Sequence, residues 1–132
     1  MSTPQSIVVK PSGKALGADI EGIDVSKPLD DALFQSLHQA WNDHLVLRLR
    51  GQELSDAQLI AFSKKFGTLD LAAVSSSGER EIPEYPQINV ISNVKVNGKS
   101  IGSLGSYEAV WHTDMSYNPE PPKMSCLYSL KV

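Results

Sequence analysis

The chain has 132 residues, of which 41% are hydrophobic and 20% are charged, a composition typical of one globular domain. Its net charge of −3 and its lack of a basic cluster argue against nucleic acid as a partner. The single cysteine, Cys126, excludes an internal disulfide, and no apolar run is long enough to cross a membrane. We therefore expect a cytoplasmic protein.

The first half of the chain predicts short strands alternating with helices. Residues 7–10 and 17–23 are predicted strands that can pair with each other, because proline and glycine lie between them. Residues 28–44 are predicted to form a helix that begins at Pro28 and carries an apolar stripe. Residues 45–50 are predicted to form a buried strand that ends at Gly51.

A second helix is predicted from Ser55 to about Phe66. Ser55 and Gln58 form a capping box in the Ser-x-x-Gln pattern, in which the hydroxyl and the amide satisfy free N–H groups at the helix start. Gly67 is a natural end for this helix.

The second half predicts loops and strands. Residues 69–86 are loop-like, residues 88–91 are strand-like, and Asn97-Gly98 predicts a tight hairpin turn. Residues 124–132 alternate apolar and polar side chains, as a strand does, up to the last residue. Because a natural domain seldom ends on an unprotected apolar strand, we expect that the chain is cut short and that it self-associates through this strand, for example as a homo-oligomer.

The segment Val-Trp-His-Thr-Asp-Met at residues 110–115 is the most informative part of the sequence. His112 and Asp114 are two residues apart in a segment predicted to be extended, so their side chains leave the same face. An imidazole and a carboxylate that converge in this way are two members of the two-His-one-carboxylate triad that binds non-haem Fe(II). The alternative is a His–Asp hydrogen bond in a strand without a metal.

The other residues that invite a functional interpretation favour structural roles. His44 is at a helix-to-strand junction, where an imidazole commonly caps free carbonyls, so we do not expect it to be the third ligand. His38 is on a helix flank and is expected at the surface or half-buried. Trp111 and Cys126 are expected to pack in the interior, although Trp111 could instead be a platform for substrate.

Three stretches together resemble the taurine dioxygenase/TfdA-like family of Fe(II)- and 2-oxoglutarate-dependent oxygenases. They are Asp-His-Leu-Val-Leu-Arg-Leu-Arg-Gly-Gln at residues 43–52, the helix at 54–67 that leads into Phe-Gly-x-Leu, and Trp-His-Thr-Asp-Met-Ser-Tyr at 111–117 followed by Pro121-Pro122. The third stretch, in this order after the other two, is the most specific. The resemblance covers nearly the whole chain.

The resemblance implies an α+β fold, a double-stranded β-helix (jelly roll) with flanking helices that is incomplete in this chain. Residues 1–132 would be the N-terminal part of a single dioxygenase domain. It implies His112 and Asp114 as metal ligands for Fe(II), with a distal histidine as the third ligand and an arginine that binds 2-oxoglutarate. Both of these are expected beyond Val132.

The implied activity is hydroxylation of a small organic substrate with O₂ and 2-oxoglutarate, with succinate and CO₂ as co-products. The implied partners are these small molecules, without nucleic acid or membrane. We expect the chain by itself to be inactive, because it lacks the third ligand. The alternative from a different class is a non-catalytic binding or interaction module, a degenerate half-barrel.

The resemblance also bears on the substrate. Taurine-specific members carry histidines just after Phe-Gly-x-Leu, and residues 70–73 here contain none, which argues against taurine. In this family the loop that enters the metal-binding strand helps to close the substrate pocket, so Asn93 and Tyr107 are candidate substrate-binding residues. The alternative for residues 97–107 is a plain hairpin turn.

Overall fold

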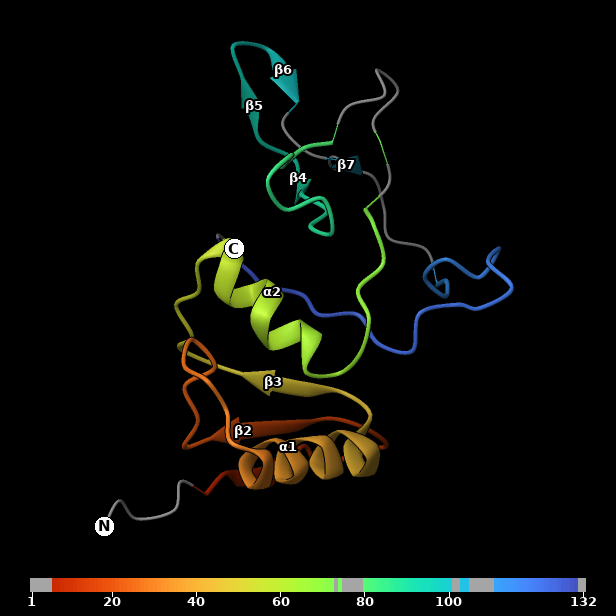
Figure 1. The fold of residues 1–132 in the computed structure, drawn as a ribbon. Helices are drawn as coiled ribbons and strands as arrows, with labels where there is room; N and C mark the ends of the chain where they lie inside the picture. Colours follow the sequence, from red (N-terminus) through yellow and green to blue (C-terminus); the bar gives the residue numbers. More distant parts are fainter. Residues whose placement is uncertain (1–5, 73, 75–79, 101–102, 105–110, 131–132) are drawn as a thin grey trace. The chain divides into compact units, whose positions relative to one another are not determined.

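The structure, a computed structural model, describes residues 6–72, 74, 80–100, 103–104 and 111–130. The chain divides into two compact units, residues 1–66 and residues 67–132, and its described elements are helices and short strands, an α+β content (Figure 1). The buried hydrophobic residues of the described chain all lie in the first unit. In the part of the chain that the structure describes, no helix combines the length and the apolar character needed to span a membrane.

A three-stranded sheet forms the base of the first unit. Strand β1 (Val8–Pro11) pairs antiparallel with β2 (Ala18–Glu21), and β2 pairs parallel with β3 (Leu47–Leu49). Successive side chains of β2 alternate between faces, so that Ala18 and Ile20 are buried while Glu21 is exposed. One face of the sheet is therefore apolar and the other carries charges.

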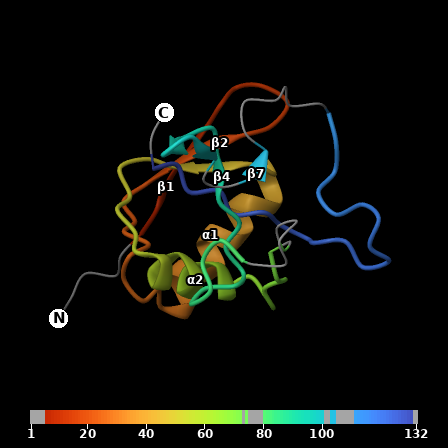
Figure 2. The ribbon, with the colours of Figure 1, turned by 90° about the horizontal axis from the view of Figure 1, so that it is seen from above.

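Helix α1 (Asp31–His44) packs on the apolar face of the sheet (Figures 1 and 2). It begins three residues later than the sequence predicts, because Asp30 is its N-cap: the Asp30 carboxylate accepts a hydrogen bond of 2.7 Å from the backbone N–H of Leu33. Its apolar stripe is the predicted one, and Leu37 is completely buried. The stripe is thus the main packing surface of the first unit.

The junction between α1 and β3 is a tight turn centred on Leu45, which has a φ of 66°. The N–H of Leu45 donates to the carbonyl of Trp41, and the N–H of Val46 donates to the carbonyl of His44, each at 2.7 Å. The second bond closes a γ-turn of the rare, strained kind. The predicted buried strand at 45–50 is therefore wrong at its start: Leu45 and Val46 are exposed, and β3 itself is only half-buried.

Helix α2 (Asp56–Lys64) begins with the predicted capping box. Gln58 N–H donates to the Ser55 hydroxyl at 3.3 Å, and Ser55 N–H donates to the Gln58 side-chain oxygen at 2.8 Å. The Gln58 amide also donates to the carbonyl of Ser26 at 3.1 Å. The start of α2 is thereby attached to the loop that follows β2, and Phe62 and Phe66 pack against the core.

Gln52 connects the end of β3 to the same loop. Its side-chain oxygen accepts a hydrogen bond from the N–H of Val25 at 2.9 Å, and its amide donates to the carbonyls of Ile23 at 3.1 Å and Arg50 at 3.2 Å. These three bonds pair backbone groups that no strand satisfies. They hold the loop against the strand without any ladder between them.

The second unit contains only short strands. β4 (Ile91–Ser92) pairs parallel with β7 (Ser103–Leu104), and β5 (Lys95–Val96) pairs antiparallel with β6 (Lys99–Ser100). The predicted turn at Asn97-Gly98 is confirmed: both residues have positive φ, 51° and 77°, as a two-residue hairpin loop requires. These small sheets form no complete jelly roll within the described residues.

The predicted strand at residues 124–132 is not found in its described part. Residues 124–130 have no strand assignment, because none of the described strands pairs with them, while residues 131–132 lie outside the described range. An alternating pattern by itself cannot make a strand without a partner. Leu127 and Leu130 are accordingly more than 80% exposed, at 82% and 84%.

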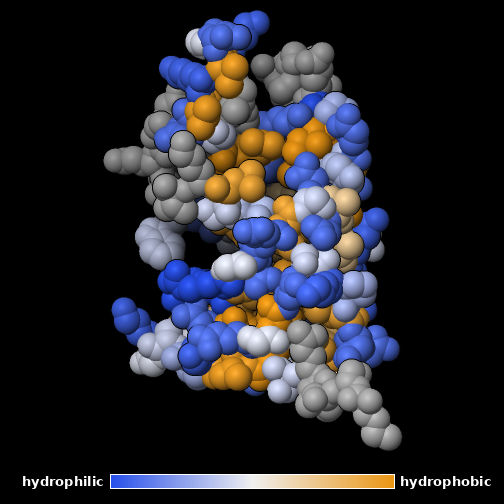
Figure 3. All heavy atoms as spheres, turned by 90° about the vertical axis from the view of Figure 1, so that its left-hand side faces the viewer, coloured by the Kyte–Doolittle hydropathy of each residue, from blue (hydrophilic) through white to orange (hydrophobic). Residues whose placement is uncertain are grey.

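Hydrophobic side chains reach the surface in both units. Figure 3 shows such residues among polar ones on the face that it draws. In the second unit Trp111 is fully exposed, so the prediction that it packs in the interior is wrong, and Cys126 is exposed as well. The expected interior packing depended on a strand through the motif for Trp111 and on the strand at 124–132 for Cys126, and the described residues of these segments form no strand.

Candidate metal centre

His112 has no strand, helix or turn assignment and Asp114 begins a turn, so neither residue lies in a strand. Residues 114–117 form a turn in which the N–H of Asn118 donates to the carbonyl of Met115 at 2.9 Å. Met115 has a φ of 49°, which is uncommon for a residue with a side chain and reverses the chain just past Asp114. The described part of the predicted extended segment is therefore not assigned as a strand, and the predicted convergence of the two side chains is present.

The two side chains meet at hydrogen-bond distance. His112 Nε2 is 3.0 Å from Asp114 Oδ1, while the Ser125 hydroxyl donates to Asp114 Oδ2 at 2.7 Å. Each carboxylate oxygen thus has a different partner. The side chains of His112 and Asp114 remain 61% and 55% exposed, so both can be reached from solvent.

The surroundings of Asp114 favour its ionised form. The pKa of this carboxyl is lowered, first by the hydrogen bond from the Ser125 hydroxyl and second by the hydrogen bond with His112, against a small opposing effect of burial. An ionised carboxylate only accepts hydrogen bonds, so His112 Nε2 donates in this arrangement. A metal ion bound at Nε2 would replace that proton and the hydrogen bond with it.

The donor pair fits a divalent transition metal. An imidazole nitrogen and a carboxylate oxygen suit iron, and two adjacent ligands of an octahedron with bonds of about 2.1 Å are about 3.0 Å apart. The observed separation of Nε2 and Oδ1 is 3.0 Å. Among the described residues no group of three His, Cys, Asp or Glu side chains could hold a metal, so His112 and Asp114 are a candidate pair without a third such side chain from that part of the chain.

The other two histidines belong to the first unit and have structural surroundings. His38 is half-buried in an aromatic cluster with Phe34, Trp41 and Phe66, at ring centroid distances of 5.9, 5.6 and 6.3 Å. His44 ends α1, and its carbonyl accepts hydrogen bonds from Gly17 and Val46. The half-buried position predicted for His38 is confirmed.

The candidate substrate residues are placed only in part. Asn93 is exposed in the link between β4 and β5, next to a turn in which Val94 N–H donates to the Ser92 hydroxyl at 3.0 Å. Tyr107 lies outside the described residues. A role of either residue in substrate binding stays a prediction.

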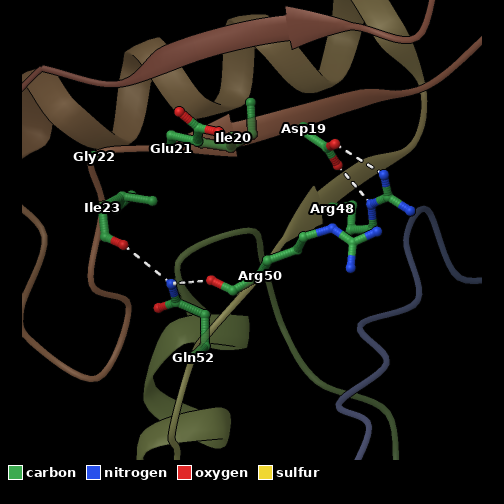
Figure 4. Close-up of a pocket in the computed structure, with 8 residues that line it drawn as sticks. All are labelled: Asp19, Ile20, Glu21, Gly22, Ile23, Arg48, Arg50 and Gln52. Carbon is green, nitrogen blue, oxygen red and sulfur yellow. Dashed lines mark hydrogen bonds and ion pairs between the residues drawn. The ribbon is translucent and has the colours of Figure 1, made fainter. Parts of the chain in front are cut away.

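The first unit has a hollow of about 250 Å³ on the charged side of its sheet (Figure 4). Asp19 and Arg48 line it and form a two-bond ion pair, with the Asp19 oxygens 2.5 and 2.8 Å from Nε and Nη2. The Arg48 guanidinium lowers the pKa of Asp19. None of the predicted site residues lines this hollow.

Sequence reasoning missed two contacts that join distant residues. Ser125 reaches Asp114 across eleven residues, and Arg48 reaches Asp19 across twenty-nine. The alternation in residues 124–132 placed Ser125 among the polar positions, which is the only local signal it carries. The partner that a polar side chain finds depends on the fold between them.

The comparisons with known proteins agree with the motif. Residues 9–132 match the family described as "Taurine catabolism dioxygenase TauD, TfdA family". The chain is 31% identical over 122 residues to pentalenolactone F synthase of Streptomyces avermitilis, covering 91% of this chain and 39% of that protein. It is 28% identical over 134 residues to the alpha-ketoglutarate-dependent 2,4-dichlorophenoxyacetate dioxygenase of Cupriavidus pinatubonensis, covering 96% of this chain and 46% of that protein.

A solved structure supports the fold of the chain. It is a putative alpha-ketoglutarate-dependent taurine dioxygenase from Burkholderia xenovorans, with a TM-score of 0.54 and 30% identity over 61% of this chain and 28% of that one. The chain spans less than half the length of these relatives. Because the family match extends from residue 9 to residue 132, the chain belongs to the TauD/TfdA family of dioxygenases.

Proposed function

We propose that the chain is part of an Fe(II)- and 2-oxoglutarate-dependent dioxygenase in which His112 and Asp114 are two of the three protein ligands of the metal. The observation that carries this proposal is the 3.0 Å approach of His112 Nε2 to Asp114 Oδ1 within the Trp-His-Thr-Asp motif. Relatives of the chain are named as alpha-ketoglutarate-dependent dioxygenases and sulfate ester dioxygenases, which favours this class over a non-catalytic binding module.

Within this proposal the residues have distinct tasks. When bound, Fe(II) and 2-oxoglutarate would supply, with O₂ as the oxidant, the oxidative decarboxylation that yields succinate and CO₂, one oxygen atom entering succinate and the other the hydroxylated product. His112 offers a neutral nitrogen once Nε2 has lost its proton, and Asp114 offers a negatively charged oxygen, a state that the hydrogen bonds from Ser125 and His112 favour by lowering the pKa of the carboxyl. The positive φ of Met115 turns the backbone away immediately after the second ligand.

The family match supports a proposal for the domain and for the class of substrate. We propose that residues 1–132 contribute to a single TauD/TfdA-like domain whose complete form is a double-stranded β-helix. The substrate is a small organic molecule, with Asn93 and Tyr107 as candidate contacts. Residues 70–73 carry no histidine after Phe-Gly-x-Leu, so taurine is not the substrate that this proposal favours.

A metal titration tests the ligand pair. Mn(II) replaces Fe(II) without oxidation, and free Mn(II) can be followed by its electron paramagnetic resonance signal. The wild-type chain is expected to bind Mn(II), and His112→Ala and Asp114→Ala are each expected to lose this binding. His44→Ala is the matched control, because it removes an imidazole that ends a helix in the first unit, and it should bind as the wild type does. Absence of binding by the wild type, or binding that survives both substitutions, would refute the ligand pair.

A further inference from the structure

Ser125 holds the second oxygen of the candidate ligand Asp114. Its hydroxyl lies 2.7 Å from Asp114 Oδ2, whereas His112 Nε2 lies 3.0 Å from Asp114 Oδ1. A hydrogen bond from a hydroxyl to a carboxylate is charge-assisted and stronger than one between neutral groups. The carboxylate is therefore fixed in orientation, with Oδ1 directed toward the imidazole.

The fact that each Asp114 oxygen has a different hydrogen-bond partner matters for the way in which the carboxylate could bind a metal. A carboxylate binds a cation through one oxygen or through both, and binding through both occupies an additional coordination position. An oxygenase of the proposed class needs open positions for its co-substrate and for O₂, since the two-His-one-carboxylate triad works by leaving them open. A hydrogen bond on Oδ2 favours binding through Oδ1 alone.

We propose that Ser125 is a positioning residue of the metal centre, which restricts Asp114 to one-oxygen coordination and thereby keeps a coordination position open. The inference rests on the proposed role of His112 and Asp114 as ligands. Ser125 touches neither substrate nor metal in this account; it acts through the carboxylate. Groups that hold metal ligands in this way commonly change metal affinity by about 10- to 100-fold when they are removed.

The position of Ser125 in the chain supports this role. It follows the loop that contains Pro119, Pro121 and Pro122, and its bond to Asp114 joins the two ends of that loop. Proline restricts the backbone of the intervening residues, so the separation of the two ends varies less than in a flexible loop. The proline-containing loop that follows the His-x-Asp motif therefore places the Ser125 hydroxyl next to the Asp114 carboxylate.

The test compares three serine variants of the full 132-residue chain with Mn(II) as the probe. Ser125→Ala is expected to weaken Mn(II) binding by about 10- to 100-fold, and water-proton relaxation of the bound ion should report about one coordinated water fewer, because Oδ2 then displaces it. Ser125→Thr keeps a hydroxyl and is expected to restore both values. Ser129→Ala removes an exposed serine from the same segment and should match the wild type.

The outcomes separate this inference from the proposed function. If His112→Ala abolishes binding while Ser125→Ala binds Mn(II) with wild-type affinity and hydration, Ser125 has no positioning role and the inference is wrong. If His112→Ala retains binding, the ligand pair itself is wrong. A purely structural role of Ser125 predicts a lower unfolding midpoint for Ser125→Ala with unchanged hydration of the bound ion, and that result also overturns the inference.

Discussion

Replacing Gln52 by alanine is expected to destabilise the first unit considerably, although the side chain lies outside the hydrophobic core. The substitution removes an acceptor from the N–H of Val25 and two donors from the carbonyls of Ile23 and Arg50. A hydrogen bond contributes about 0.5–1.5 kcal/mol net, and its loss is most costly where the partner is shielded from water. Gln52 is half-buried, so water replaces part of what is lost and we expect about 1.5–3 kcal/mol for the three bonds together.

The measurement is urea unfolding followed by far-ultraviolet circular dichroism. With a denaturant dependence of about 1–3 kcal/mol per molar urea, a loss of this size lowers the midpoint by about 1 M. Gln39→Ala is the matched control. It removes one exposed bond of 2.8 Å to Asp43 on the surface of α1, which is expected to change stability by less than about 0.5 kcal/mol.

Gln52→Glu distinguishes the donors from the acceptor. The glutamate keeps an oxygen for Val25 N–H but presents its charge to two carbonyl oxygens, so this variant should be unstable at neutral pH and should regain stability when the carboxyl is protonated. If Gln52→Ala unfolds within about 0.2 M urea of the wild type, in the range of the control, then these three bonds do not support the loop and the reasoning is refuted.

Four further predictions concern single positions. Ser55→Ala should lower stability by about 0.5–2 kcal/mol, because it removes one half of the capping box, and an unchanged urea midpoint would contradict this. Leu45→Gly should leave stability unchanged or raise it by up to about 2 kcal/mol, because relief of a strained φ outweighs the entropy of glycine; a loss above about 0.5 kcal/mol would count against the strain. The pKa of Asp24 is lowered from 3.8 to about 2, mainly by the hydrogen bond from the Ser26 hydroxyl. The ionised carboxylate therefore stabilises the folded chain above pH 4, and this stabilisation is lost as the pH falls toward 2. The stability of Asp24→Asn should consequently depend less steeply on pH in that range than the stability of the wild type does. The chain by itself should release no succinate from 2-oxoglutarate, since its described residues contain no group of three His, Cys, Asp or Glu side chains that could hold the metal, and succinate release that His112→Ala abolishes would disprove this.

Local patterns predicted the parts of the structure whose partners are near in sequence. The capping box at Ser55, the Asn97-Gly98 turn and the apolar stripe of α1 each depend on groups within one or two helical turns or within one hairpin. The convergence of His112 and Asp114 belongs to the same class. It is present although Asp114 begins a turn, because residues two apart can approach each other in more than one backbone conformation.

The wrong predictions share a cause: each predicted structure needed a second element of the fold to pair with or pack against. Residues 124–130 alternate as a strand does but are not paired with any described strand, and the expected interior positions of Trp111 and Cys126 depended on such pairing. The predicted start of the first helix was wrong by three residues. Pro28 and Asp30 both suit a helix start, and the bond from Leu33 N–H to the Asp30 carboxylate decided between them.

The sequence by itself determined the family, the main helices and the convergence of His112 with Asp114, because these depend on short-range spacing of residue types. Only the tertiary structure decided which polar groups meet across long stretches of chain. Ser125 on the Asp114 carboxylate, Arg48 on Asp19 and Gln52 on the loop after β2 are contacts of this kind. A side-chain hydrogen bond reaches only about 3 Å, so its existence between distant residues follows from the path of the whole backbone between them and not from the residue types alone.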